Sequence, residues 1–192
     1  MPLPILAGIS LVSELAGNEK VREGVSSFTK KGISFIKDAL RDVDDLPEIT
    51  SQDFDLVFEY TENLFGLLGL LLQTDSQVCE KKVNAIQNIF EVLCFSETGY
   101  LQEPVLQFLD ISKKDFEQHI GAIIQAPNTL KKMSRFAIKH HLEYEFYEYF
   151  VRVAYNEKSY VSSNDQELLD AMAESFSVNA FDVRTIVNKY KN

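Results

Sequence analysis

The chain has 192 residues, 45% of them hydrophobic, with 14 Phe and 8 Tyr, and its formal net charge is −10. This length and apolar content predict one folded domain, or one domain with an appendage, and they exclude an intrinsically disordered chain. The negative charge argues against nucleic acid and anionic lipid surfaces as partners, because both would repel the protein.

The excess of acids lies in one stretch of the chain. Between Asp42 and Glu80 there is no Lys, Arg or His, and the acids there account for the whole difference between 29 acids and 19 basic residues. They are Asp42, Asp44, Asp45, Glu48, Asp53, Asp55, Glu59, Glu62, Asp75 and Glu80. Such a stretch is typical of a solvated face that aids solubility. It is also suited to steering a basic partner or collecting divalent cations.

The N-terminal region is predicted to be a helical extension, residues 1–45. From Asn18 to Arg41, apolar residues recur at 3/4 spacing, and the acidic connector DVDDLPEI then separates this region from a main domain at 50–192. Three roles remain open for residues 1–40: packing on the main domain, forming a homodimer, or lying on a membrane surface beside their Lys and Arg residues. Glutamates on the same helix dilute that basic face.

Cysteine usage and the N-terminal sequence predict a cytoplasmic protein. Cys79 and Cys94 fall within one predicted helix, where their Cα atoms would be roughly 22 Å apart and could not form a disulfide. Two unpaired thiols are typical of a reducing compartment. The N-terminus lacks a signal-peptide pattern, and its apolar stretch is shorter than the ~20 residues of a membrane-spanning helix.

The main domain is predicted to be all-α, and the chain as a whole to contain about seven to nine helices. No convincing alternation of apolar and polar residues suggests a strand, whereas capping residues and helical periodicity recur throughout. The expected helices are Phe54–Gln73, Val78–Cys94, Pro104–Leu109, one from Ser112 to before Pro127, one from Asn128, Leu142–Tyr155, one from Ser163, and one from Asn179 to about Lys189.

Part of the sequence recurs imperfectly at a single offset. Residues Val78–Phe95 match Val161–Val178, 83 positions later and without gaps. Just before each copy, an apolar run ends in an acid, Asp75 in the first and Glu157 in the second. This recurrence predicts a bundle built from two degenerate helix-turn-helix repeats, because neither copy could bury its apolar face alone.

The repeat resembles a known pattern, in which an apolar helix is followed by A-D-G-x-[IV]-[ST]-x-x-E and a second helix. The first copy is similar to it at Leu70–Glu80 and the second at Val151–Leu169. The pattern is that of the tellurite-resistance TerB family, and the N-terminal domain of some membrane-anchored DnaJ-like co-chaperones also resembles it. Over 53–190, the resemblance implies a bacterial or phage protein of stress-response or envelope-associated assemblies.

The resemblance also implies a candidate metal site. The family places two acids per copy near a tight turn, a geometry suited to a hard divalent cation. Here the acids would be Asp75, Glu157 and Asp165, but Lys82 replaces the second acid of the first copy and neither turn contains glycine. The alternative is that Asp75 and Asp165 cap helix N-termini.

Other residues predict no catalytic centre. The adjacent His140 and His141 would point about 100° apart on a helix, and no nucleophile lies beside a base. We therefore expect no enzymatic activity and no cofactor. Tyr144, Tyr147 and Tyr155 are candidates for a partner-binding face, although their 3/4 spacing equally fits a core stripe.

The sequence thus predicts a non-enzymatic, cytoplasmic protein-interaction module of TerB-like type that binds another protein. Two alternatives remain open. One is a divalent-metal-binding stress-response protein, and the other is an acidic inhibitor or immunity-type protein that binds a basic partner.

Overall fold

The computed structural model describes residues 51–75, 79–96, 99, 101, 106, 110–156 and 161–191, with the backbone alone for 51–55. The predicted N-terminal extension at 1–45, most of the predicted helix Pro104–Leu109, and Glu157 lie outside the described residues.

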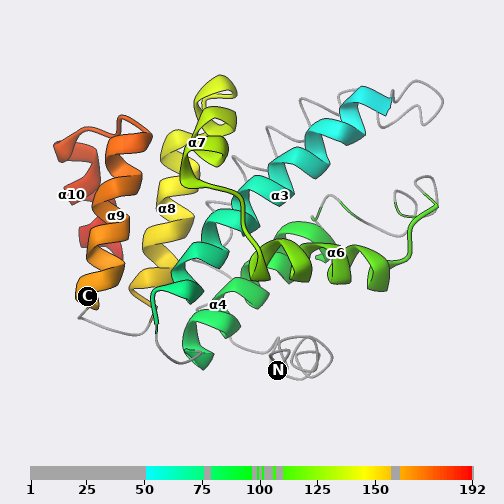
Figure 1. Cartoon of the computed structure of the whole chain (residues 1–192), viewed down its shortest axis with the longest axis horizontal. Coiled ribbons are helices and arrows are strands. Elements are labelled where there is room, and N and C mark those ends of the chain that lie inside the picture. Colours follow the sequence, from blue (N-terminus) through cyan, green and yellow to red (C-terminus); the bar gives the residue numbers. More distant parts are fainter. Residues whose placement is uncertain are drawn as a thin grey trace. The chain divides into compact units, whose positions relative to one another are not determined.

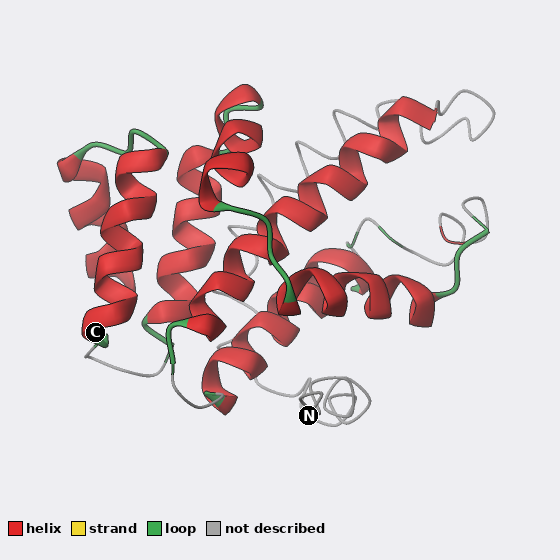
Figure 2. Cartoon of the chain, in the orientation of Figure 1, coloured by secondary structure: helices red, strands yellow, loops and turns green. Residues whose placement is uncertain are grey.

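Helices are the only regular elements of the described part of the chain (Figure 2). The prediction of an all-α protein is therefore confirmed. In chain order they are α3 (Ser51–Gln73), α4 (Glu80–Phe90), the π-helical turn η3 (Glu91–Phe95), α6 (Lys113–Gln125), α7 (Leu130–Lys139), α8 (Glu143–Ala154), α9 (Ser163–Ser175) and α10 (Ala180–Tyr190) (Figure 1). Within the described ranges, no helix is both long and apolar enough to cross a membrane.

Polar caps explain why several helices begin where they do. Oγ of Ser112 accepts a hydrogen bond from the backbone N–H of Asp115 at 3.1 Å, at the start of α6. Oδ1 of Asn179 accepts from the N–H groups of Phe181 and Asp182, each at 3.0 Å, at the start of α10. These side chains pair N–H groups that have no partner within the helix.

The chain divides into two compact units, neither of them continuous in sequence. Among the described residues, those of 51–58 and 87–122 belong to the first unit, and those of 59–86 and 123–191 belong to the second. Helices α3, α4 and α6 each contribute residues to both units.

The described core of the first unit is aromatic. The ring of Phe116 lies 5.4 Å from that of Phe58 and 6.0 Å from that of Phe90, between ring centroids. Phe95 on η3 packs edge-on against Phe90, and the ammonium of Lys113 lies 4.2 Å from the centre of the Phe95 ring. Aromatic pairs in such geometries stabilise a core beyond the area they bury.

In the second unit, α8 packs against α7, α9 and α10, and α7 also contacts α9 (Figure 1). The middle of α3 is apolar on all sides, and Leu64, Leu67, Leu68 and Leu71 are fully buried. Gly69 permits a close approach there, because a Cβ atom at this position would lie 2.5 Å from the carbonyl oxygen of Ile124.

Helices α4 and α9 correspond at the offset found in the sequence. They begin at Glu80 and Ser163, 83 positions apart. Three pairs of residues at this offset are buried in both copies. They are Ile86 and Leu169, Ile89 and Met172, and, directly after the two helices, Leu93 and Phe176. Neither Cys79 nor Cys94 forms a disulfide bond.

Candidate functional site: a buried lysine between two aspartates

A lysine side chain is enclosed within the second unit. Lys82 lies in the first turn of α4, and only 4% of its surface is exposed. Burying an ammonium group is costly unless opposite charges and hydrogen bonds replace its hydration. Lys82 therefore needs partners supplied by the protein itself.

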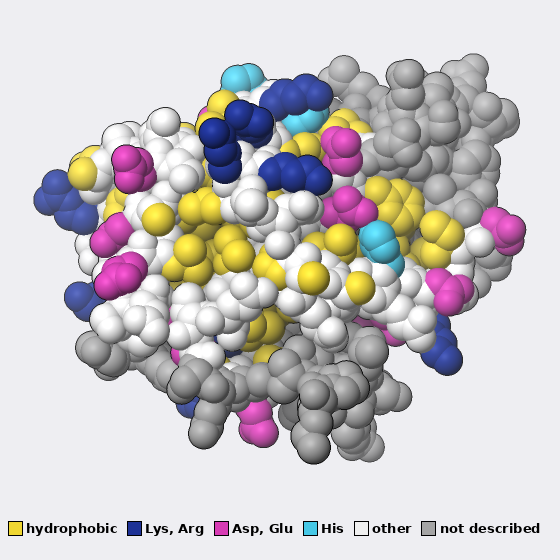
Figure 3. Space-filling view, viewed as in Figure 1, with side chains coloured by type: hydrophobic (Ala, Val, Ile, Leu, Met, Phe, Trp, Pro, Cys, Tyr) yellow, Lys and Arg dark blue, Asp and Glu magenta, His cyan; other side chains and the backbone are white. Residues whose placement is uncertain are grey.

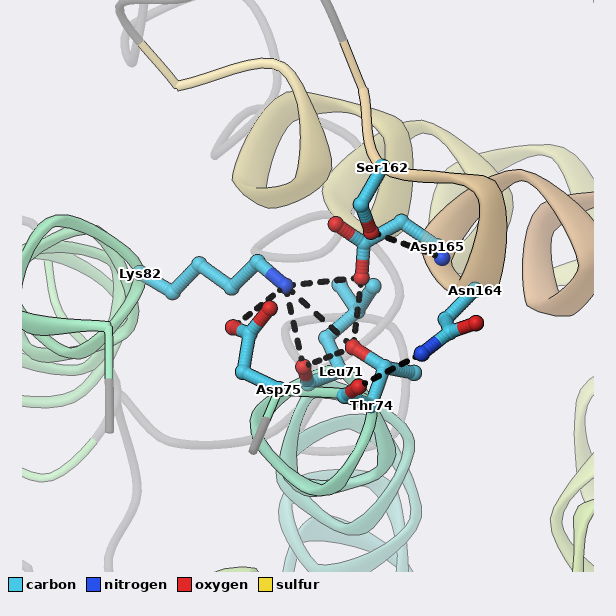
Figure 4. Close-up of polar contacts among 7 residues, drawn as sticks. All are labelled: Leu71, Thr74, Asp75, Lys82, Ser162, Asn164 and Asp165. Carbon is cyan, nitrogen blue, oxygen red and sulfur yellow. Dashed lines mark hydrogen bonds and ion pairs between the residues drawn. The ribbon is translucent and has the colours of Figure 1, made fainter. Parts of the chain in front are cut away.

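Four oxygen atoms surround the Lys82 ammonium (Figure 4). Its Nζ lies 2.7 Å from Oδ1 of Asp165 and 2.8 Å from Oδ2 of Asp75. It also donates to the carbonyl oxygen of Leu71 at 3.2 Å and to Oγ1 of Thr74 at 3.3 Å. We call these five residues the lysine cluster. Its members come from the end of α3, the start of α4 and the start of α9.

Asp165 is the most buried acid of this cluster, with 3% of its surface exposed. Burial alone would raise the pKa of its carboxyl group. The hydrogen bonds from Lys82, Thr74 and Ser162 outweigh that effect and hold the pKa below its ordinary value. The carboxylate is therefore ionised at neutral pH and serves as the counter-charge of Lys82.

Two asparagines extend the polar connections around the cluster. Asn164 donates from Nδ2 to the carbonyl oxygen of Thr74 at 3.1 Å, and Asn156 donates to the carbonyl oxygen of Lys81 at 2.8 Å. These bonds join α9 to the end of α3, and the segment after α8 to α4. The arrangement is a cross-link between helices, because these hydrogen bonds and the contacts of Lys82 join residues of different elements.

The predicted metal residues are only partly brought together. Asp75 and Asp165 both contact Lys82, and Glu157 lies outside the described residues. The lysine ammonium lies where a cation would have to bind between the two aspartates. Among the residues that the structure describes, no three His, Cys, Asp or Glu side chains are arranged to hold a metal ion.

The capping alternative applies differently to the two aspartates. Asp165 lies in the first turn of α9, where its N–H donates to Oγ of Ser162 at 3.1 Å, and a carboxylate there also interacts favourably with the helix dipole. Asp75 follows the end of α3, and its carboxylate contacts Lys82.

The tyrosine candidates do not share one surface. Tyr144 is 46% exposed, whereas Tyr147 and Tyr155 are 1% and 7% exposed and pack within the core. Burial, followed by the nearby charge of Asp170, raises the pKa of Tyr147 to about 12. Only Tyr144 among the three offers its ring to a partner.

A second buried polar pair was not anticipated from the sequence. The Tyr60 hydroxyl donates to Oε1 of Glu145 at 2.5 Å, and both residues are buried. The pair joins α3 to α8. In the sequence, this pair is indicated only by Glu145, which falls at a core position of the predicted helix Leu142–Tyr155. A carboxylate at such a position requires a hydrogen-bond donor nearby.

Comparison with known proteins places little constraint on this site. No protein-family model matches the chain, and no solved structure does. The chain is similar to Vivapain-1 of Plasmodium vivax (strain Salvador I), with 28% identity over 123 residues, which covers 60% of this chain and 21% of that protein. It thus spans about a fifth of the length of the curated relative. A match of this identity and coverage does not define a family.

Proposed function

We propose that this chain is a non-enzymatic, cytoplasmic protein-interaction module of the TerB-like helical type. The observation that carries the proposal is the lysine cluster. Its two buried charges, Lys82 and Asp165, lie 2.7 Å apart, and the half-buried Asp75 contacts Lys82 at 2.8 Å. A cluster whose polar groups bind one another holds helices together and has a structural role. We therefore place the binding of a partner on the surface of the protein.

The correspondence of α4 and α9 supports the repeat on which the TerB-like interpretation depends. The two helices begin 83 positions apart and bury equivalent side chains. We infer that they belong to two diverged copies of one helical unit. Repeated helical units commonly present extended surfaces to other proteins.

The alternative function, divalent-metal binding through Asp75, Glu157 and Asp165, is disfavoured by Lys82. A metal ion between Asp75 and Asp165 would require the buried ammonium to leave or to lose its proton. Isothermal titration of the purified protein with Ca²⁺, Mg²⁺ and Zn²⁺ separates the two functions. Binding heat at millimolar ion, lost in Asp165→Asn, would favour the metal-binding protein.

The test of an interaction module is reconstitution with a purified partner. A protein recovered by affinity purification and mass spectrometry would be expressed separately and titrated into the full chain, with complex mass measured by light scattering. We expect a complex of defined stoichiometry. Turnover in an unbiased substrate screen, abolished by one polar substitution, would contradict the proposal.

A further inference from the structure

Four basic side chains lie on the exposed face of α7. Lys131, Lys132, Arg135 and Lys139 are exposed, while the opposite face buries apolar residues that include Met133 and Phe136. In Figure 3 the dark-blue side chains gather at the position of α7, with histidines beside them. We call Lys131, Lys132, Arg135 and Lys139 the basic face.

This face lies in a stretch of chain that contains no acid. From residue 118 to residue 142 there is no Asp or Glu, although the whole protein has a net charge of −10. A charged face often serves only solubility. That explanation fits poorly here, because these cations bring the net charge closer to zero, and proteins become less soluble in that direction.

The basic residues also destabilise α7, the helix on which they lie. Lys131 and Lys132 lie in the first turn of α7, which has no acid, so they meet the positive end of the helix dipole. Lys131, Arg135 and Lys139 follow one another at four-residue spacing, where like charges repel. Among the described residues, none of the four forms a salt bridge that would offset this repulsion. Lys132 donates a hydrogen bond to the side-chain oxygen of Asn128 at 3.3 Å, but this neutral partner adds no opposite charge. A repulsion that no acid offsets is typical of residues kept for binding.

We propose that the basic face of α7 binds an acidic segment of a partner protein. The inference rests on the proposed function, and it names the surface and the class of partner. Charge complementarity identifies the partner as an anion, and α7 is short, about 15 Å at 1.5 Å per residue. Ile138 is 43% exposed beside these cations and offers an apolar contact to a peptide side chain. A long polyanion or an anionic bilayer would extend beyond this face and would be repelled by the rest of the protein, since the chain as a whole has a net charge of −10.

The test uses the full chain and a fluorescein-labelled acidic dodecapeptide of Asp and Glu with one central Leu, followed by fluorescence anisotropy. The test variant is Lys131→Gln/Lys132→Gln/Arg135→Gln. We expect its affinity to fall about tenfold, because three charge contacts are lost. The wild-type affinity should also fall as salt is raised. The variant should unfold at higher urea concentration than the wild type, since repulsion within α7 is relieved.

A charge-matched control removes three exposed cations elsewhere, as Lys114→Gln/Arg184→Gln/Lys191→Gln. It should bind within about twofold of the wild type, because these three cations are not part of the basic face and exposed charges outside a contact are screened by salt. Equal weakening in both variants would overturn the proposal. So would equal binding of a peptide with amides in place of its acids, or tighter binding of phosphatidylserine vesicles or duplex DNA through the same residues.

The two proposals fail in different ways. If a reconstituted partner binds the test variant as well as the wild type, the interaction module stands and the basic face is the wrong surface. If the dodecapeptide binds through the basic face but the captured protein forms no defined complex, the basic face stands and the module lacks support.

Discussion

Lys82 and Asp165 are 83 positions apart, and their side chains form a buried ion pair at 2.7 Å. The separation equals the offset between the two predicted copies, so the pair joins equivalent positions of those copies. Identical charges in contact at two buried positions would repel each other, so the opposite charges of Lys82 and Asp165 allow both side chains to be buried together.

Lys82→Met is expected to destabilise the protein strongly. The substitution keeps the length of the side chain but leaves the carboxylate of Asp165 buried without its counter-charge. Removing one partner of a buried ion pair typically costs about 3–5 kcal/mol. Urea unfolding, followed by circular dichroism, measures the change in the free energy of unfolding.

The control is the double variant Lys82→Met/Asp165→Leu, in which neither charge remains. It should be more stable than the sum of the two single substitutions implies, by at least about 1 kcal/mol of coupling. Additive losses would mean that the two side chains do not interact in solution.

The stability of the protein should fall in acid, in part because of Asp165. Its pKa is lower in the folded protein than the value of about 3.9 expected in the unfolded chain. Its stabilisation is therefore fully present above about pH 4 and is lost as the pH falls through the folded-state pKa. Unfolding free energies measured from pH 7 to pH 3 should decline less steeply in Asp165→Asn than in the wild type. Parallel curves would show that folding does not lower the pKa of Asp165.

Lys82→Asp should convert the lysine cluster into a cation site. The new carboxylate would join those of Asp75 and Asp165, near the carbonyl oxygen of Leu71 and the Thr74 hydroxyl. Calcium prefers such a set of oxygen ligands, and a ligand that binds only the folded state stabilises it. Millimolar Ca²⁺ should raise the melting temperature of this variant by several degrees.

The matched control for that experiment is Lys82→Asn, which removes the lysine but adds no charge. It should respond to Ca²⁺ much less than Lys82→Asp. A Ca²⁺ response of similar size in the wild type would instead support the metal-binding alternative.

The helices could be predicted well from the sequence because their signals are local. Capping at Ser112 and Asn179 involves residues two or three positions apart, and the structure contains these contacts. The lysine cluster could not be predicted in the same way. In the sequence, Lys82 indicates only the loss of an acid, although its equivalent at the repeat offset is Asp165. An alignment of two copies pairs these positions but does not predict that their side chains touch.

Residue spacing alone also does not predict which tyrosines of α8 and its C-cap are buried and which are exposed. A 3/4 pattern shows which residues share a side of a helix, but not how many neighbours the helix has. Helix α8 packs against α7, α9 and α10 and also contacts α3, so Tyr147 and Tyr155 are buried as well. For a related reason, the sequence does not predict the division into two compact units. Helices α3, α4 and α6 are continuous across it, and periodicity does not show which half of a helix packs with which neighbours.

Tyr144→Ala and Tyr147→Ala should differ sharply in their effect on stability. Tyr147 is almost fully buried, and truncation of a large core side chain costs about 3–5 kcal/mol. Tyr144 is 46% exposed, so its truncation should change stability by about 0.5 kcal/mol or less. Thermal unfolding of both variants measures the difference. Equal losses would show that Tyr144 is also packed, which would remove it as a candidate for partner binding.

Gly69→Ala should destabilise the protein, whereas Gly66→Ala should change its stability little, although both replace a glycine within α3. In a helix interior, alanine is favoured over glycine by about 1 kcal/mol. At Gly69 a Cβ atom would lie 2.5 Å from the carbonyl oxygen and 2.9 Å from Cα of Ile124, so the backbone would have to move. Overpacking of this kind costs about 1–3 kcal/mol, which exceeds the gain in helix propensity.

At Gly66 the nearest atom to such a Cβ is the sulfur of Met133, at 2.8 Å, and a flexible methionine can change rotamer more cheaply than a backbone can shift. We therefore expect the free energy of unfolding of Gly66→Ala to lie within about 0.5 kcal/mol of the wild-type value. Gly69→Ala should unfold at a clearly lower urea concentration than the wild type. Equal stability of the two variants would show that α3 does not approach Ile124 as closely as described. The comparison is informative because the substitution, the helix and the propensity term are the same in both proteins.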